Sequence, residues 1–231
     1  NPEKEAFDNM TTFRLEPSIH SLELLEEFEQ ALTKYGVDHF PVHIKLNTGM
    51  NRAGLDEKDI PELLHFFRRP RTSYLRSVFS HLAGSDEAIH DEFTLGQIRH
   101  FEKFSERIQA HFDYPVWRHL LNSGGIERFP QYHYDMVRLG IGLHGISVNN
   151  APLIPVSAFK SYITAIREVD AGQPIGYGRK SYTSRPSRIA IIPVGYADGL
   201  NRTLSNRVGA VIVHGRRAQI SGNISVGSCM I

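Results

Sequence analysis

Short apolar runs alternate with longer amphipathic segments over about the first two thirds of the chain. Turn residues bound the apolar runs, as is typical of buried parallel strands. We predict strands over residues 16–21, 42–46, 77–81, 119–123 and 136–142. Apolar residues recur at helical spacing in the segment that begins at Ser21, and in residues 56–67 and 91–112. This alternation predicts a parallel sheet whose strands are joined by right-handed crossovers.

The pattern changes near residue 155. Helical spacing disappears, and apolar runs punctuated by Gly and Pro predict strands over residues 161–169, 188–193 and 210–213. His214 and Gly215 separate two such runs and predict a hairpin turn. We therefore expect two domains. Residues 1–155 would form part of a TIM-type (β/α)8 α/β barrel, about its last five strands, since a complete barrel takes about 250 residues. Residues 156–231 would form part of an all-β domain.

Composition excludes several classes of protein. The 231 residues carry 26 Lys and Arg against 25 Asp and Glu, which argues against a nucleic-acid partner. No apolar run approaches the roughly 20 residues of a membrane span. The single cysteine, Cys229, excludes a disulfide framework and, without a signal peptide, favours a cytoplasmic location. We expect no metal site, because Pro41 separates His39 from His43 on any helix and no His-Glu-x-x-His motif occurs.

Four successive predicted strands each deliver polar groups at or near one end. These groups are Lys45 and Arg52, then His81, then the turn at Asn122, Ser123 and two glycines, and finally Arg138. Each has an ordinary alternative: Arg52 can be a surface arginine, His81 a structural histidine, and such Gly-rich turns are common. Functional groups gather where parallel strands end, however, and an arginine in an apolar strand requires a partner. The coincidence of the four therefore predicts a site that includes phosphate recognition by backbone N–H groups.

Taken together with two later motifs, these segments resemble the alanine racemases over nearly the whole chain. The matching stretches are residues 43–52 (HIKLNTGMNR), 80–81 (SH), 122–123 (NS), 135–141 (DMVRLGI), 176–178 (GYG) and 195–199 (GYADG). Residues 1–3 and 15–17 are also similar to the racemase half of bifunctional proteins fused to a cell-wall peptide ligase. The resemblance implies an isomerase that interconverts L- and D-alanine for peptidoglycan synthesis. It also implies pyridoxal phosphate as cofactor, an amino-acid substrate, and a homodimer with shared active sites.

The resemblance also implies a role for each matching residue. Tyr177 matches the tyrosine base that one protomer contributes to the site of the other. His81 and Arg138 match the groups hydrogen-bonded behind that tyrosine, and Arg138 also matches the arginine that faces the pyridine nitrogen. Arg52 matches the arginine near the cofactor phenolic oxygen and the substrate carboxylate, and Lys45 matches a lysine that is often carbamylated. The phosphate-cradle positions are Asn122, Ser123, Gly140 and Ile141, and the substrate entryway positions are Tyr196 and Arg202.

Racemisation through a planar carbanion needs a base on each face. A free tyrosine holds its proton up to a pKa near 10, so neighbouring groups must assist a tyrosine base near neutral pH. The second base of the family is the lysine that binds the cofactor, in an apolar run followed by Lys-Ala-Asn/Asp-Ala-Tyr-Gly. These 231 residues contain no such segment. We expect it upstream of Asn1, and we expect the chain alone to be inactive and poorly soluble.

A second departure concerns the substrate pocket. Val226 and Gly227 stand where the family usually has Met-Asp, close to the substrate carboxylate. Two alternatives to an alanine racemase therefore stay open. One is a related racemase for another amino acid, such as serine. The other is a degenerate, non-catalytic relative that serves as a structural module.

Overall fold

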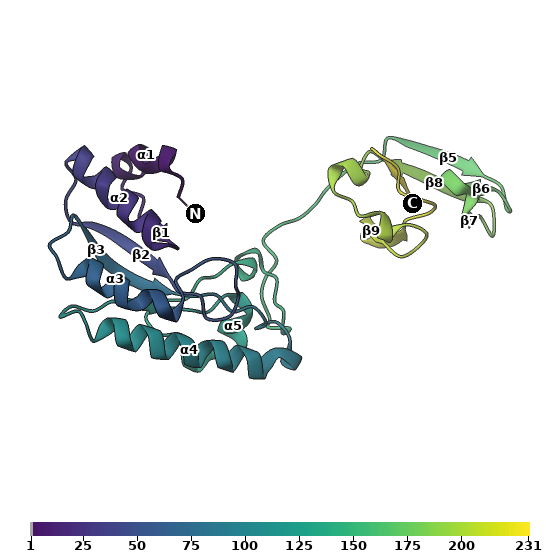
Figure 1. Ribbon diagram of the computed structural model, residues 1–231. Helices are drawn as coiled ribbons and strands as arrows, with labels where there is room; N and C mark the ends of the chain where they lie inside the picture. Colours follow the sequence, from purple (N-terminus) through teal and green to yellow (C-terminus); the bar gives the residue numbers. More distant parts are fainter. Residues whose placement is uncertain (1) are drawn as a thin grey trace. The chain divides into compact units, whose positions relative to one another are not determined.

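The chain divides into two compact units in a computed structural model that describes residues 2–231. The first unit is Asn1–Ser157 and the second is Ala158–Ile231. Figure 1 shows mixed helices and strands in the first, and strands with short helical turns in the second. Each unit has its own apolar core. None of the described helices is long and apolar enough to cross a membrane.

Four parallel strands form the sheet of the first unit. They are β1 (Ser18–Ile19), β2 (Phe40–Lys45), β3 (Ser73–Phe79) and β4 (Trp117–His119), hydrogen-bonded in the order β1-β2-β3-β4. All three pairings are parallel, which confirms the predicted parallel sheet. In β2, Val42 and Ile44 are fully buried while His43 and Lys45, at the alternate positions, are only partly buried. The period of two therefore sends the apolar and the polar residues to opposite faces.

Helices connect these strands, as their spacing predicted. The α-helices are α1 (Phe7–Thr12), α2 (Leu22–Tyr35), α3 (Ile60–Phe67), α4 (Asp91–Gln109) and α5 (Ser123–Arg128). The 3-10 turns are η1 (Lys4–Ala6), η2 (Glu57–Asp59), η3 (Ala88–His90), η4 (Pro130–Tyr132) and η5 (Ile141–His144). In Figure 1, α3 and α4 run side by side along the sheet.

Helix α2 shows how local sequence sets these elements. The Ser21 hydroxyl accepts a hydrogen bond from the N–H of Leu24 and caps the first turn, as predicted. Gly36 ends the helix at a left-handed φ of 64°. Between these caps Leu24, Leu25, Phe28 and Leu32 form a buried apolar stripe, and the one buried carboxylate of the helix, Glu29, accepts from the Ser73 hydroxyl. Burial of this stripe against the sheet stabilises the helix more than its intrinsic propensity does.

Two strand predictions need correction. Residues 136–142 form no strand: Met136 makes a single isolated bridge to His119, and η5 begins at Ile141. The N–H groups of Gly140 and Gly142 bond to the Ser123 hydroxyl, so they are not available to a strand ladder. The predicted strand 119–123 instead ends at His119, because the Asn122 side chain caps α5. The first unit therefore has four barrel-type strands where five were expected.

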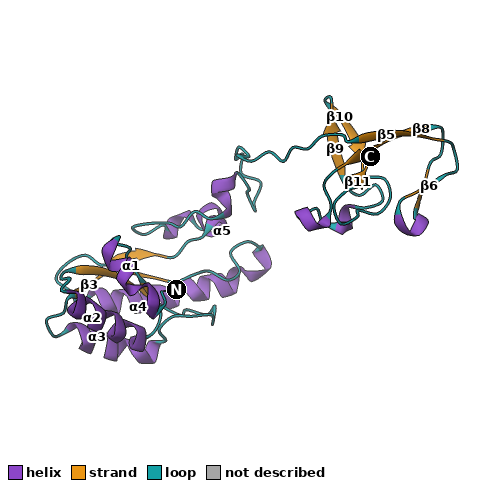
Figure 2. Cartoon of the chain, turned by 90° about the horizontal axis from the view of Figure 1, so that it is seen from above, coloured by secondary structure: helices purple, strands orange, loops and turns teal. Residues whose placement is uncertain are grey.

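The second unit is built from short antiparallel pairs. Strands β5 (Ala165–Val169), β8 (Ser187–Ile192) and β11 (Cys229–Met230) form one sheet, with β8 in the centre. Strands β6 (Pro174–Ile175) and β7 (Ser181–Tyr182) pair with each other, as do β9 (Ala210–Val213) and β10 (Arg216–Gln219). The remaining elements are the 3-10 turns η6 (Tyr177–Arg179), η7 (Tyr196–Asp198) and η8 (Arg202–Leu204), which Figure 2 shows as the helical segments of this unit.

The β9–β10 hairpin confirms the predicted turn. His214 and Gly215 have φ values of 48° and 75°, which is the pattern of the tight hairpin turn that matches strand twist. The small core of the unit contains Ile192, Val194, Ile220, Ile224 and Cys229. Burial raises the pKa of the Cys229 thiol above its usual value.

Candidate functional site

Four cationic or titratable side chains lie near enough for their charges to act on one another, beside the strand ends of the first unit. Lys45 is the last residue of β2, Arg52 lies in the loop that follows, and His81 follows β3. Arg138 lies beyond α5 and η4, where its N–H bonds to the Leu121 carbonyl just past β4. The pKa of His81 is lowered, first by burial and then by the charges of Arg138, Arg52 and Lys45. The pKa of Lys45 is lowered by burial, and then by Arg52 and Arg138. Within the described residues none of the four takes part in an ion pair. Their uncompensated charge favours an anionic ligand.

Arg138 is held by a dense set of acceptors. Its Nη1 donates to Nδ1 and to the carbonyl oxygen of His119, at 2.5 and 3.1 Å. Its Nη2 donates to the carbonyl oxygens of Ser80 and Leu120, at 2.5 and 3.0 Å. Burial lowers the pKa of Arg138 to about 10. The guanidinium is therefore fixed in place by neutral acceptors, with no carboxylate to cancel its charge.

The loop that carries Arg52 is shaped by one asparagine. The Asn47 carboxamide oxygen accepts from the N–H groups of Gly49 and Asn51, and its nitrogen donates to Asp56 Oδ1 at 2.9 Å. Gly54, at a φ of 129°, passes so close to β2 that a Cβ would lie 2.8 Å from the backbone of Leu46. These contacts fold the loop back beside the strand end and leave Arg52 exposed at its tip.

Backbone donors converge near the start of α5. The Ser123 hydroxyl oxygen accepts from the N–H of Gly140 at 3.0 Å and of Gly142 at 3.1 Å. Because both bonds end on its oxygen, the hydroxyl proton of Ser123 is free to donate to a ligand. The Asn122 side chain caps α5 at Gly125 N and accepts from Ser85 Oγ at 2.7 Å. The structure thus brings Asn122, Ser123, Gly140 and Ile141 into one small region.

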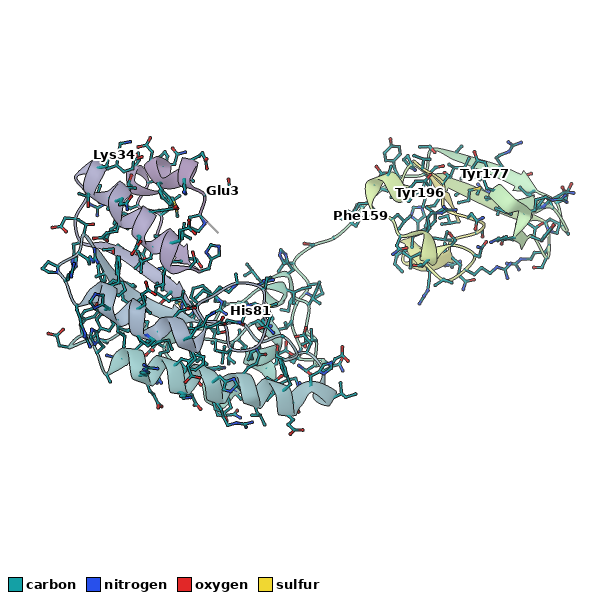
Figure 3. All side chains as sticks on the ribbon, in the orientation of Figure 1. Glu3, Lys34, His81, Phe159, Tyr177 and Tyr196 are labelled. Carbon is teal, nitrogen blue, oxygen red and sulfur yellow. The ribbon has the colours of Figure 1, made fainter. Side chains whose placement is uncertain are left out.

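The other predicted site residues lie in the second unit. Tyr177, Tyr196 and Arg202 line a cavity of about 320 Å³ together with the segment 223–227. The Arg202 guanidinium lies over the Tyr196 ring, 5.4 Å from its centroid. Tyr177 stands between Gly176 and Gly178, both with positive φ, and 76% of its surface is exposed. Figure 3 labels Tyr177 and Tyr196 in this unit and His81 in the first.

Close backbone packing builds this cavity. The N–H of Tyr196 donates to the Ser225 carbonyl at 3.0 Å, and the N–H of Ala197 donates to the Val226 carbonyl at 2.9 Å. Gly195 is required for this approach, because a Cβ there would lie 2.3 Å from both carbonyl oxygens. Gly227, by contrast, has open space where its Cβ would be. Tyr196 is therefore locked against the segment that contains Val226 and Gly227.

His119 is a site residue that the sequence does not predict. Residue 119 is predicted only as the start of a strand, whereas in the structure its imidazole is the side-chain partner of Arg138. No hydrogen bond joins the side chains of Arg138 and His81 among the described residues. The missed signal was a polar residue directly before an apolar pair, on the predicted strand whose end carries Asn122 and Ser123.

Family comparisons agree with both units. The family described as "Alanine racemase, N-terminal domain" matches residues 1–148, and "Alanine racemase, C-terminal domain" matches residues 156–231. The chain belongs to the alanine racemase family. An alanine racemase of Syntrophobacter fumaroxidans is 41% identical over 190 residues, which are 80% of this chain and 50% of the relative. One from Sorangium cellulosum is 35% identical over 233 residues, covering 100% of this chain and 61% of the relative.

Solved alanine racemases share the fold. A Clostridium difficile 630 alanine racemase superposes with a TM-score of 0.86 at 28% identity, covering 100% of this chain and 61% of that one. The Bartonella henselae enzyme, solved with covalently bound pyridoxal phosphate, has a TM-score of 0.77 at 30% identity, covering 100% and 62%. The chain thus spans from 50% to 62% of the length of these alanine racemases.

Proposed function

We propose that the protein containing this chain is a pyridoxal phosphate-dependent alanine racemase. It interconverts L- and D-alanine in the cytoplasm for peptidoglycan precursors and works as a homodimer with shared active sites. The observation that supports this proposal is the group of three cations near His81 at the strand ends: after burial, the charges of Arg138, Arg52 and Lys45 lower the pKa of that histidine. These four residues belong to the segments that match the alanine racemase motifs.

The residues present fit pyridoxal phosphate. The phosphate needs several donors, and the free hydroxyl proton of Ser123 beside the glycine N–H groups supplies that kind of environment. The phenolic oxygen needs a cation, which Arg52 provides. The pyridine nitrogen needs a donor, which Arg138 provides. When bound, the cofactor withdraws electrons from the α-carbon of the amino acid and so acidifies its α-proton.

The residues of this chain control where protons go. Arg138 cannot protonate the pyridine nitrogen, since a guanidinium holds its proton far more tightly than an acid does. It therefore moderates electron withdrawal and limits side reactions. His81 is kept neutral by burial and by the cations around it, so its imidazole can accept a hydrogen bond. In the proposed dimer, Tyr177 of one protomer removes or returns the α-proton on one face of the amino acid held by the other protomer, whose His81 imidazole assists it. The second base is the family lysine, in a segment that these 231 residues do not contain.

A related racemase for a larger or more polar amino acid is the second candidate. Gly227 leaves open space in the cavity beside Tyr177 and Tyr196, where a side chain longer than methyl has room. A panel of amino acids including serine separates the two candidates. Strong preference for L- and D-alanine supports the first, whereas faster turnover of serine supports the second.

The decisive experiment uses the full-length protein loaded with pyridoxal phosphate. We expect D-alanine to form from L-alanine, and Tyr177→Phe to reduce kcat by about 10² or more, as removal of a general base does. Cofactor binding by the variant should stay within about threefold of wild type, because a protonated tyrosine contributes little to it. Cofactor binding without racemisation of any amino acid would support the non-catalytic alternative and overturn the proposal.

A further inference from the structure

A continuous row of polar side chains crosses the sheet of the first unit and ends at Arg138. His119 Nε2 lies 3.0 Å from Ser77 Oγ, and Ser77 Oγ lies 2.6 Å from His43 Nδ1. His43 Nε2 lies 2.7 Å from Glu16 Oε2. The residues come from β4, β3, β2 and the segment before β1, so the row spans three strands and the segment that leads into the fourth. Among the described residues of this row, His119 is the one that hydrogen-bonds to Arg138.

Sheet register brings these residues together. His43 pairs with Ser77 only because the β2–β3 register shifts between Val42 and His43. Ser77 is fully buried and His119 is 5% exposed, while His43 and Glu16 are more accessible. The His119 ring also stacks on Phe79, with centroids 4.9 Å apart and planes 3° from parallel. A buried polar group costs free energy unless it has a hydrogen-bond partner, and each member of this row supplies a partner for the next. The row is therefore part of what stabilises this arrangement of the sheet.

Hydrogen-bond chemistry gives the row a single direction. Arg138 can only donate, so Nδ1 of His119 must accept and carries no proton. Burial, followed by the charge of Arg138, lowers the pKa of His119 to about 3, and the ring is therefore neutral with its proton on Nε2. That proton is donated to Ser77 Oγ. The Ser77 hydroxyl then donates to Nδ1 of His43, and Nε2–H of His43 donates to the Glu16 carboxylate.

The alternative arrangement loses a bond. If His43 were an imidazolium, both histidines would donate to Ser77, and the buried Ser77 hydroxyl proton would have lost the acceptor that Nδ1 of His43 provides. A buried donor without an acceptor costs free energy comparable to a lost hydrogen bond. The hydrogen-bond pattern therefore favours the arrangement in which Nδ1 of His43 accepts from Ser77 and Nε2 donates to Glu16. The other charged group near Glu16 is Arg76, whose pKa is raised first by its hydrogen bond to Tyr74 and also by the Glu16 carboxylate.

We propose that Glu16, His43 and Ser77 form a proton-ordered relay that fixes the His119 tautomer and thereby positions the Arg138 guanidinium. All three are positioning residues that act through His119. This inference rests on the proposed function for the role of Arg138 toward the cofactor, but the tautomer order itself belongs to the protein alone. Loss of the relay removes the acceptor for the Nε2 proton of His119 and so weakens the preference for this tautomer over the Nδ1–H tautomer, which cannot accept from Arg138.

The first test is ¹⁵N NMR of the imidazoles in full-length, cofactor-free protein at pH 8. We expect both His43 and His119 to be neutral, each with a protonated Nε2 and an unprotonated Nδ1. The Glu16→Leu variant removes the final acceptor and should populate the Nδ1–H tautomer of His43. Glu16→Gln keeps an acceptor oxygen and should restore the wild-type spectrum. An imidazolium at His43, or no change in Glu16→Leu, would refute the relay.

The second test measures the cofactor dissociation constant and the kinetics. Ser77→Ala should weaken pyridoxal phosphate binding by about three- to tenfold, the value of one hydrogen bond, and lower kcat with little change in KM. Ser73→Ala is the matched control, because Ser73 is also buried on β3 but bonds to Glu29 outside the relay. The control should leave the cofactor dissociation constant within about twofold of wild type. Equal effects of the two substitutions would overturn the positioning role.

The two tests separate this inference from the proposed function. If the protein shows the predicted tautomers but neither binds pyridoxal phosphate nor racemises an amino acid, the relay stands and the proposed function fails. If it racemises alanine while His43 is an imidazolium, the function stands and the relay fails.

Discussion

Replacing Arg138 by lysine isolates the contribution of the guanidinium fork. Arg138 donates from two nitrogens to four acceptors: Nδ1 of His119 and the carbonyl oxygens of Ser80, His119 and Leu120. A lysine keeps the charge and its burial cost, but it places all its donors on one nitrogen atom. It can therefore reach about two of these acceptors. Two charge-assisted bonds are lost, at about 1.5 kcal/mol each or somewhat more.

We expect Arg138→Lys to lower the free energy of unfolding of the first unit by about 2–4 kcal/mol. Trp117 is the only tryptophan of the chain and lies in β4, so its fluorescence reports unfolding of this unit. A urea titration of the 231-residue chain at submicromolar concentration should show a midpoint about 1–2 M lower than wild type. Keeping the concentration low limits association through exposed apolar residues such as Leu139, Ile141 and Leu143.

Arg99→Lys is the matched control, because Arg99 is exposed on α4. It should change stability by less than about 0.5 kcal/mol. If Arg138→Lys changes the free energy of unfolding by no more than the control does, the hydrogen bonds of the buried guanidinium do not stabilise the fold. Such a result would contradict the role given to these bonds in holding Arg138.

Three further predictions concern pH, packing and a modified lysine. The pKa of His119 is about 3 in the folded protein and about 6.5 in the unfolded chain. Between these values only the unfolded state binds a proton at His119, so the free energy of unfolding falls as the pH drops below about 6.5. Lowering the pH from 7.5 to 5 should cost about 2 kcal/mol more in wild type than in His119→Asn, by urea titration at both pH values; equal losses would contradict this. Gly195→Ala should destabilise the second unit by about 1–3 kcal/mol, whereas Gly227→Ala, which meets open space, should be near neutral. Cys229 is buried and should react with a thiol reagent only when the second unit opens, so its reaction rate in increasing urea measures the stability of each variant. Similar rates in the two variants would contradict the packing argument. Because its pKa is lowered, Lys45 has a larger fraction of unprotonated amine near pH 8 than an ordinary lysine. Incubation with ¹³C-bicarbonate should therefore give a carbamate NMR signal that is absent from the Lys45→Ala variant. A signal that persists in this variant comes from another amine and contradicts the prediction.

Local pattern was enough to predict the elements that depend on neighbours in sequence. The Ser21 cap and the apolar stripe of α2 lie within one helix, and the His214–Gly215 turn joins adjacent strands. Each is specified by periods of 3.6 or 2 and by turn chemistry. Residues 136–142 have the same apolar character as a strand but do not form one. Their N–H groups have a stronger competitor in the Ser123 hydroxyl, which lies 17 and 19 residues away in sequence.

The sequence by itself determined the parallel sheet, the change to β structure near residue 155, and the identity of the charged side chains at the strand ends. Only the tertiary structure decided which side chains are partners. His119 and Ser77 are 42 residues apart, and Ser77 and His43 are 34 apart, and they meet because of one register shift between β2 and β3. A change of register by one residue would send His43 to the opposite face. Periodicity specifies which face a residue occupies, but only the packed sheet specifies which residue lies across from it.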